Sequence, residues 1–223
     1  MPKSKLFDKN RHYYDEWFDK HPQIYHTELE AIQRILPPFK KGLEIGVGTG
    51  RFAKPLGIEV GVEPSEAMAQ IAKSRGIQVV PGVAKKLPFA DESFDLVLMV
   101  TTICFVDDAD RALQEIHRIL TPKGDLILAF VDKESDLGRF YLANRDKSRF
   151  YKEATFYSKK EIFKLLKKHG FILEACNESL FGDTLTNLHY EIVDGCKKGG
   201  AFLVLRAKKR EAKAKEAPSS LLQ

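Results

Sequence analysis

Three glycines at alternate positions, Gly46, Gly48 and Gly50, follow a short apolar segment early in the chain. An acid, Glu44, precedes the first glycine by two positions, and the next apolar segment ends in Glu63. Glycines allow a tight turn and let bare backbone approach a ligand closely. A carboxylate at the end of the neighbouring strand can accept hydrogen bonds from both hydroxyls of a ribose. The pattern therefore predicts a site for a ligand with an adenosine end.

The spacing of the glycines indicates which kind of ligand this is. The dinucleotide fingerprint needs a third glycine one residue after Gly50, where a helix packs closely while its N-terminus faces a pyrophosphate. A carboxylate at Glu44 would also repel a pyrophosphate, whereas it favours an ammonium group, directly or through water. We therefore expect a positively charged ligand without phosphates, and an NAD-dependent dehydrogenase is the disfavoured alternative.

Further motifs follow the glycine loop in a fixed order, at residues 63–68, 82–89, 93–97 and 120–126. With this ordered set the chain resembles the class I S-adenosylmethionine-dependent methyltransferases, in particular the small-molecule group that includes the quinone-biosynthesis C-methyltransferases. The resemblance extends over roughly residues 13–208. It implies an enzyme with S-adenosylmethionine as its cofactor, which transfers a methyl group by in-line displacement.

The resemblance also implies which residues hold the cofactor. In this family an aspartate that binds the adenine amino group often follows the glycine of the third motif, and this chain has Val83 there. We expect apolar contact from Val83 and backbone groups near Ala84 to hold the adenine, while Thr101 lines the methionine end. The predicted cofactor-binding residues are Glu44, Gly46, Gly48, Gly50, Glu63, Pro64, Val83, Ala84 and Thr101.

Short apolar segments alternate with helical patterns along most of the chain. This alternation predicts an α/β fold, doubly wound, with helices on both faces of a mostly parallel sheet. The resemblance implies a Rossmann-like methyltransferase fold with seven strands, of which the last is antiparallel. Because only residues 51–56 separate Gly50 from Gly57, the first crossover should be clipped. The predicted strands are residues 42–45, 59–62, 78–80, 96–100, 126–130, 171–176 and 201–205.

Several predicted helices begin at a residue that can cap their first backbone N–H groups. The predicted caps are Ser65, Asp108, a capping box of Ser158 with Glu161, and a second capping box of Thr27 with Glu30.

Two segments are candidates for enclosing a substrate. We predict that residues 1–36 form a helical lid rich in aromatic side chains, and that residues 131–157 form a substrate-cover insertion within a methyltransferase domain of residues 37–208. Residues 209–223 are predicted to be a charged tail. An alternative for the aromatic residues of the first helix is that they only pack it onto the sheet. The predicted substrate-binding residues are Tyr13, Tyr14, Trp17, Tyr141 and Arg145.

The composition fits one globular domain. A chain of 223 residues with 43% hydrophobic residues can form one sizeable core. The sequence contains no apolar stretch of the ~20 residues that span a bilayer, so we expect a cytoplasmic protein without a membrane partner. The three cysteines, Cys104, Cys176 and Cys196, are far apart and form no metal-binding motif, so the sequence predicts neither a disulfide nor a metal site.

The formal charge of +5 comes mostly from the C-terminal end. Residues 206–216 hold six basic and two acidic residues, a net charge of +4 that leaves +1 for the rest of the chain. A solvated terminus explains this segment most simply, and docking to an anionic partner is the alternative. We therefore expect no nucleic-acid partner.

The expected reaction is methyl transfer to an N, O or C nucleophile of a small molecule, whose identity the sequence does not give. A rival hypothesis is methylation of a nucleic acid or protein, and another is a non-catalytic S-adenosylmethionine-binding module. The nearly neutral body of the chain favours the small molecule. Because the sulfonium is already a strong methyl donor, we assign no catalytic base. No oligomeric state is assigned.

Overall fold

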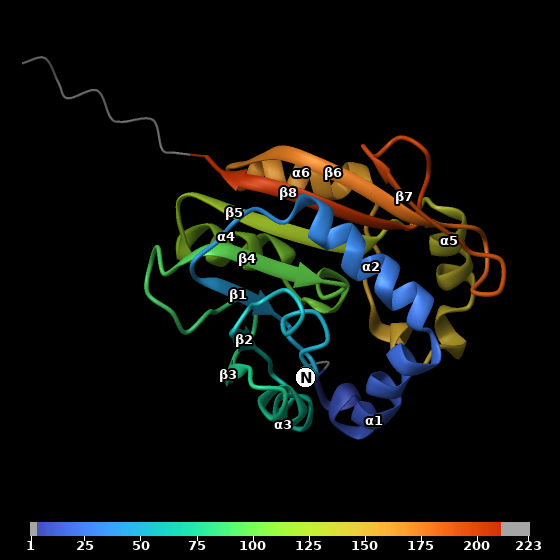
Figure 1. Ribbon diagram of the computed structural model, residues 1–223, viewed down its shortest axis with the longest axis horizontal. Helices are drawn as coiled ribbons and strands as arrows, with labels where there is room; N and C mark the ends of the chain where they lie inside the picture. Colours follow the sequence, from blue (N-terminus) through green and yellow to red (C-terminus); the bar gives the residue numbers. More distant parts are fainter. Residues whose placement is uncertain (1–3, 211–223) are drawn as a thin grey trace, which may run out of the picture.

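A mixed β-sheet forms the centre of the protein, whose computed structural model describes residues 4–210 (Figure 1). Within those residues the sheet has eight strands in the order β3-β2-β1-β4-β5-β8-β6-β7. Pairing is parallel from β3 to β5 and antiparallel between β5 and β8, β8 and β6, and β6 and β7. The strands are β1 Gly42–Ile45, β2 Val60–Val62, β3 Gln78–Val80, β4 Phe94–Val100, β5 Leu120–Val131, β6 Phe171–Phe181, β7 His189–Asp194 and β8 Phe202–Lys209.

Helices cover both faces of the sheet, as predicted (Figure 1). Successive residues of β4 point to opposite faces, so Leu96 and Leu98 pack in one apolar cluster and Val97 and Met99 in the other. The first cluster includes residues of α1, α2, α3 and α5, and the second includes residues of α4 and α6. The helices are α1 Ser4–Lys20, α2 Pro22–Ile35, α3 Glu66–Ser74, α4 Ala109–Ile119, α5 Asp136–Ala143 and α6 Lys159–Lys168, with short 3₁₀ turns η1 Ile103–Phe105, η2 Arg145–Lys147 and η3 Tyr151–Glu153.

The sheet has one strand more than predicted. The seven-stranded prediction treats residues 177–200 as a connection, but β6 continues to Phe181 and β7 then pairs with it. The last strand in the chain, β8, is antiparallel to β5, as predicted. β7 escaped prediction because its side chains are exposed or half-buried and show no apolar alternation.

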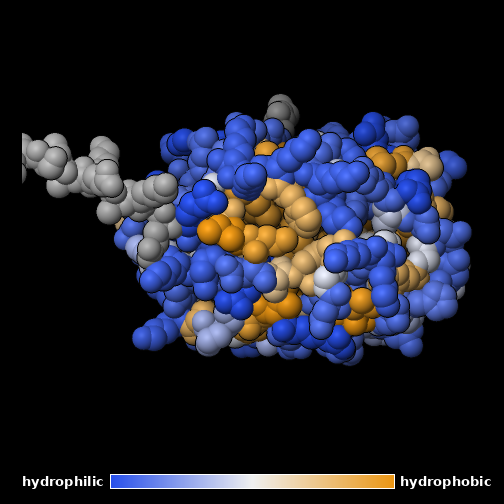
Figure 2. Space-filling view, turned by 90° about the horizontal axis from the view of Figure 1, so that it is seen from above, coloured by the Kyte–Doolittle hydropathy of each residue, from blue (hydrophilic) through white to orange (hydrophobic). Residues whose placement is uncertain are grey.

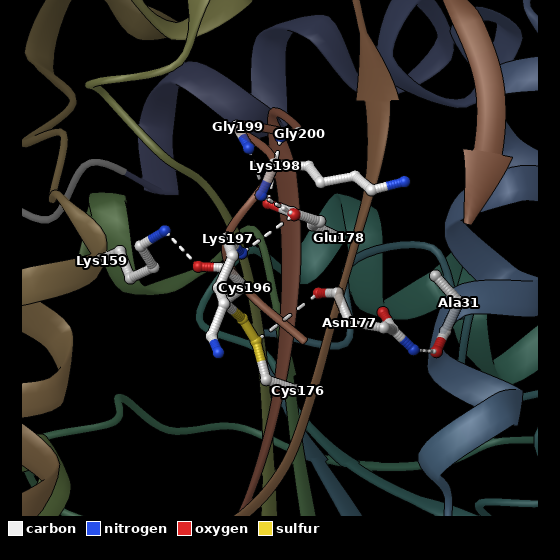
Figure 3. Close-up of a disulfide and its surroundings, with 10 residues drawn as sticks. All are labelled: Ala31, Lys159, Cys176, Asn177, Glu178, Cys196, Lys197, Lys198, Gly199 and Gly200. Atoms are coloured by element: carbon white, nitrogen blue, oxygen red, sulfur yellow. Dashed lines mark hydrogen bonds between the residues drawn. A yellow bond between two sulfur atoms is a disulfide. The ribbon is translucent and has the colours of Figure 1, made fainter. Parts of the chain in front are cut away.

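Buried polar residues explain why β6 extends beyond its apolar part (Figure 3). Asn177 donates its side-chain N–H to the carbonyl of Ala31 in α2 at 2.7 Å. The carboxylate of Glu178 accepts hydrogen bonds from the backbone N–H groups of the loop before β8, namely Lys197, Lys198, Gly199 and Gly200. These partners satisfy the Asn177 amide N–H and the Glu178 carboxylate, which would otherwise be costly to bury. The Asn177 Oδ1 and the Ser179 hydroxyl have no partner among the described residues.

The cysteine prediction is wrong for two of the three residues. Cys176 in β6 and Cys196 just after β7 form a disulfide, with their Cα atoms 5.9 Å apart (Figure 3). The Gly195 N–H donates to the carbonyl of Cys176 at 2.7 Å, so the closing of the β6–β7 pair brings the two cysteines together. The 20-residue separation gave no local signal, because strand register sets this contact. Cys104 is not part of this disulfide, and its thiol donates to the carbonyl of Thr101 at 3.2 Å.

Three of the predicted caps are confirmed. Ser65 accepts from Met68, Asp108 accepts from Arg111, and the capping box before α6 is complete.

The predicted capping box at Thr27 is wrong. The helix α2 begins at Pro22, a residue well suited to a first turn, and Thr27 lies inside it, donating its hydroxyl to the carbonyl of Gln23 at 2.8 Å. Thr27 is also buried, so it belongs to the packed face of the helix.

The first crossover is clipped, as predicted. Residues 49–57 between β1 and β2 form a series of turns in place of a helix. No helix within residues 4–210 has the length and apolarity needed to cross a membrane. The predicted charged tail lies outside the described residues from residue 211 onward.

The surface over β6 and β7 is partly apolar. Figure 2 shows apolar side chains gathered in the middle of the face seen from above. Ile172 and Leu173, at the start of β6, are 43% and 42% exposed. β7 pairs only with residues 177–181 of β6. Within residues 4–210, the start of β6 at Ile172 and Leu173 therefore has no neighbouring strand on the side where β7 lies.

We expect Glu178→Ala to lower the free energy of unfolding by about 3 kcal/mol or more, because four buried or half-buried N–H groups lose their acceptor. Urea denaturation measures the change. Glu174→Ala, an exposed acid on the same strand, is the control and should be nearly neutral. Equal stability of the two variants would show that the Glu178 contacts do not hold the loop.

Candidate active site

A cavity of about 810 Å³ begins at the carboxyl ends of β1, β2 and β4 and continues beneath α1 and α2. This edge is where parallel sheets bind ligands. Its two ends differ in chemistry, and we call them the glycine half and the aromatic half. The glycine half includes Gly46, Gly48, Glu63, Pro64, Gly82, Val83, Ala84, Thr101 and Thr102, and the aromatic half includes Phe7, Tyr14, Trp17, Phe105, Phe140, Tyr141, Phe150 and Tyr151.

The glycine loop needs residues without side chains. Gly46 and Gly48 have φ angles of +70° and +54°, in the left-handed region that glycine tolerates. A Cβ atom at Gly46 would lie 2.5 Å from the side chain of Thr102. A Cβ at Gly48 would point at the Tyr14 hydroxyl from 3.6 Å and fill part of the cavity. The loop therefore offers bare backbone to whatever binds there.

Glu63 is fixed by the loop that it faces. Its carboxylate accepts hydrogen bonds from the backbone N–H groups of Gly48 and Ser65, both at 2.9 Å and one to each oxygen. Burial raises the pKa of Glu63 to about 7, even though these two hydrogen bonds act to lower it. Each oxygen keeps a lone pair, because a carboxylate can accept about four hydrogen bonds. Glu63 is thus oriented to accept two further donors from the cavity.

Glu44 and Gly50 lie behind the cavity wall and do not line it. Gly50 has a φ of +81° and approaches α3, where a Cβ would be 3.4 Å from that of Ala72. Glu44 is 2% exposed, and its Oε2 has no hydrogen-bond partner among the described residues. Burial raises the pKa of Glu44 well above its usual range, and the hydrogen bond from the Ala53 backbone only partly offsets this.

The remaining predicted residues of the glycine half, Pro64, Val83, Ala84 and Thr101, all line the cavity. Thr101, at the end of β4, has a φ of +45°, which is unusual for a β-branched residue. Its N–H donates to the carbonyl of Ala129 at 2.8 Å, so the sheet holds the strained conformation. Such strain is typical of functional sites.

An ion-pair network that sequence reasoning missed ties α1 to the glycine loop. The carboxylate of Asp15 accepts from Arg51 at 2.9 Å, from Arg75 at 2.7 Å and from the Thr49 hydroxyl at 2.7 Å. Burial would raise the pKa of Asp15, but these hydrogen bonds lower it well below its usual range. The partners lie more than 30 residues apart in the chain, so no local pattern could have revealed the network.

The aromatic half contains four of the five predicted substrate-binding residues, namely Tyr13, Tyr14, Trp17 and Tyr141. Tyr13 is 52% exposed at the rim, where the Arg149 guanidinium lies 4.5 Å from the centre of its ring. The fifth, Arg145, is exposed on η2 and does not line the cavity. Further aromatic residues from α1 and from residues 131–157 complete the wall, including a stacked pair of Phe7 and Phe150 with ring centres 5.4 Å apart.

Glu28 is the acidic residue of the aromatic half, and the sequence analysis missed it. It lies on α2, is 7% exposed and lines the cavity. The available signal was its helical spacing, because Ile24, Glu28, Ala31 and Ile32 form one buried stripe.

Comparisons with known proteins agree with this description. A family model described as a methyltransferase domain matches residues 43–128. A crystal structure of a S-adenosylmethionine-dependent methyltransferase of Thermotoga maritima, described as a "possible histamine N-methyltransferase", is 48% identical with a TM-score of 0.87, covering 92% of this chain and 99% of that one. An uncharacterised protein of Methanocaldococcus jannaschii is 41% identical over 92% of this chain and 98% of its own length. A methyltransferase structure from Methanosarcina mazei, 20% identical over 81% of this chain and 97% of that one with a TM-score of 0.62, shares the fold.

The sheet order and the glycine half define an α/β enzyme that binds a nucleoside cofactor at the carboxyl ends of its strands. The chain belongs to the class I S-adenosylmethionine-dependent methyltransferases. It is therefore a methyltransferase, and S-adenosylmethionine is its cofactor, as the sequence predicted.

The glycine half fits this cofactor. Bare backbone at Gly48 leaves room for its linker, and the oriented carboxylate of Glu63 matches a pair of ribose hydroxyls. The partnerless oxygen of Glu44 puts a buried acceptor beneath the loop, where an ammonium group of the methionine end is expected. Val83 and Ala84 offer apolar contact and backbone groups for an adenine. We propose Gly48, Glu63, Val83 and Ala84, which line the cavity, as cofactor contacts, and Glu44 as a buried acceptor that acts from behind the loop.

We expect the affinity for S-adenosylmethionine to rise with pH through neutrality, because Glu63 accepts from the ribose only when ionised and its pKa is about 7. One such ionisation gives about a tenfold loss of affinity from about pH 8 to about pH 6. Calorimetric titration measures this loss. Glu63→Gln should bind more weakly and lose this component of the pH dependence, whereas Glu66→Gln, at an exposed acid of α3, should behave as the parent protein. A wild-type profile in Glu63→Gln would remove Glu63 from the cofactor site.

Proposed function

We propose that this methyltransferase acts on an N, O or C nucleophile of a small molecule held in the aromatic half. The observation that carries the proposal is the continuity of the cavity, since the glycine half and the aromatic half share one space of about 810 Å³. A volume of this size suits a cofactor and a small acceptor side by side. The acceptor would then meet the methyl group inside the protein and away from bulk water.

We infer that two segments supply the enclosure. The helix α1 lies across the cavity and is fixed to the glycine loop through Asp15. The segment after β5 contributes Tyr141 and Phe150 to the wall. We infer that residues 1–36 act as a lid and residues 131–157 as a substrate cover. A covered site of this kind favours a small acceptor over a nucleic acid or a folded protein.

The residues of the site act by holding and shielding the reactants. When bound, S-adenosylmethionine supplies an activated methyl group on its sulfonium. The aromatic wall orients the acceptor, and its apolar surface excludes water from the reaction. Thr101 has a strained backbone and lines the cavity. Its neighbour Thr102 donates its hydroxyl to the Val100 carbonyl at 2.9 Å, and the same oxygen lies 3.4 Å from the Gly46 carbonyl. No catalytic base is assigned for this reaction.

The name given to the Thermotoga maritima relative supports a small-molecule acceptor for this chain as well. Methylation of a macromolecule remains the second hypothesis, and a non-catalytic cofactor-binding role is the third. Release of S-adenosylhomocysteine in the presence of histamine, simple phenols or quinone precursors tests the three against one another. Methyl label that enters only RNA or protein would contradict the proposal, and label that enters nothing would favour the binding role.

We expect Tyr141→Ala to lower kcat/KM for the acceptor by about tenfold or more, because a large aromatic contact is lost from the wall. The dissociation constant for S-adenosylmethionine should not change, since Tyr141 lies in the aromatic half. Steady-state kinetics and calorimetry measure the two quantities. Leu142→Ala, the exposed neighbour on α5, serves as the control. If both constants change together in Tyr141→Ala, the division of the cavity into two halves is wrong.

A further inference from the structure

The aromatic half contains a buried acid that the methyl-transfer site as described does not use. Glu28 lies on the face of α2 that packs against the sheet, next to the fully buried residues Ala31 and Ile32. It is 7% exposed, and it lines the cavity. An acid at such a position is unusual, because removing a carboxylate from water is costly unless something binds it.

Glu28 has no hydrogen-bond or ion-pair partner among residues 4–210. Asn177, a buried polar side chain that contacts the same helix, donates to the carbonyl of Ala31 and not to Glu28. Among the described residues, three cations line the cavity, Lys85, Lys147 and Arg149, and none of them forms an ion pair with Glu28. Lys85 pairs with Asp107 at 3.6 Å, and Arg149 donates to Asn10 at 2.9 Å. Burial, acting alone, raises the pKa of Glu28 to about 8.

Aromatic residues line the same cavity as this carboxyl group. Three of them are Tyr14, Tyr141 and Tyr151, and the charge of Glu28 adds to burial, the largest cause, in raising the pKa of each. They come from α1, α5 and η3, and all three line the cavity. The aromatic faces attract a cation and the carboxylate neutralises it, so both features favour the same kind of ligand.

We propose that Glu28 binds the ammonium group of the methyl acceptor, which makes the acceptor a small amine with an apolar or aromatic body. The inference rests on the proposed function and narrows its N, O or C acceptors to amines. Glu28 acts here as a binding residue that selects the cation. A neutral phenol or alcohol of the same shape offers Glu28 a hydrogen bond but no opposite charge, so it binds more weakly than the ammonium.

The position of Tyr14 relates this subsite to the cofactor. Its hydroxyl lies 3.6 Å from where a Cβ of Gly48 would be, and its pKa responds to Glu44 and Glu63 as well as to Glu28. Tyr14 therefore lies beside the glycine loop and lines the cavity together with Glu28. An amine held at Glu28 would share one continuous space with the cofactor contacts.

The test is calorimetry on the full chain saturated with S-adenosylhomocysteine, using tyramine and 2-phenylethylamine against the alcohols of identical shape, tyrosol and 2-phenylethanol. We expect each amine to bind at least about tenfold tighter than its alcohol. At neutral pH the amine should also release close to one proton, since a carboxyl with a pKa of about 8 is mostly protonated until an ammonium binds it. Titration in two buffers of different ionisation enthalpy counts that proton.

The isosteric variant Glu28→Gln should lose both the amine preference and the proton release while keeping its affinity for S-adenosylhomocysteine. Glu30→Gln, an exposed acid on the same helix paired with Arg34, should keep both. Circular dichroism and thermal melting confirm that each variant is folded. A wild-type protein without preference for either amine, or a Glu28→Gln variant that retains it, overturns the inference. Methylation of phenols with no amine preference would refute this inference alone, whereas label found only in macromolecules would refute the proposed function.

Discussion

The enclosure of the cavity depends on one carboxylate, Asp15. It joins α1 to Arg51 of the glycine loop and to Arg75 at the end of α3, while its neighbouring turn places Tyr14 and Trp17 on the cavity wall. A helix rich in polar residues has little apolar surface to bury, so ion pairs and aromatic contacts must hold it in place. The same contacts fix the loop that faces the cofactor. The position of α1 and the shape of the cofactor site are therefore set together.

Three buried acids of this protein differ in how their charge is stabilised. Glu63 accepts hydrogen bonds from two backbone N–H groups. Glu44 accepts from one, and its Oε2 has no partner among the described residues, while Glu28 accepts from none of them. Burial raises the pKa of all three, most simply for Glu28, where no other group contributes. A buried charge needs partners, so a buried carboxylate that lacks protein partners indicates where a polar or charged group of a ligand binds. In our proposal the missing partners are the ribose hydroxyls for Glu63, the ammonium group of the methionine end for Glu44, and the acceptor for Glu28.

The parts of the fold that were predictable are those encoded locally. Short apolar runs identified the buried parallel strands, and the caps at Ser65, Asp108 and Ser158 were found because each forms within one helical turn. β7 was not found, because its own side chains show no apolar alternation and its partner β6 continues through two polar residues, Asn177 and Glu178. These two residues are buried by contacts with α2 and with the loop before β8. For Glu28 the difficulty was similar, since an acid in a helix usually faces water and only the docking of α2 on the sheet buries it. The Asp15 network joins α1 to residues far along the chain and has no local signature.

The segment that matches the methyltransferase family model explains why the cofactor was easier to infer than the acceptor. Residues 43–128 contain the whole glycine half of the cavity. Most of the aromatic half, including Tyr14, Glu28 and Tyr141, lies outside that segment, on α1, α2 and the connection after β5. Cofactor chemistry is constant across such enzymes, whereas the acceptor differs, so substrate choice must reside in the additions to the shared sheet. Among the described residues those additions contain Glu28, a buried acid that lines the cavity without a protein partner. A buried group that needs a partner discriminates between ligands more strongly than an apolar wall does.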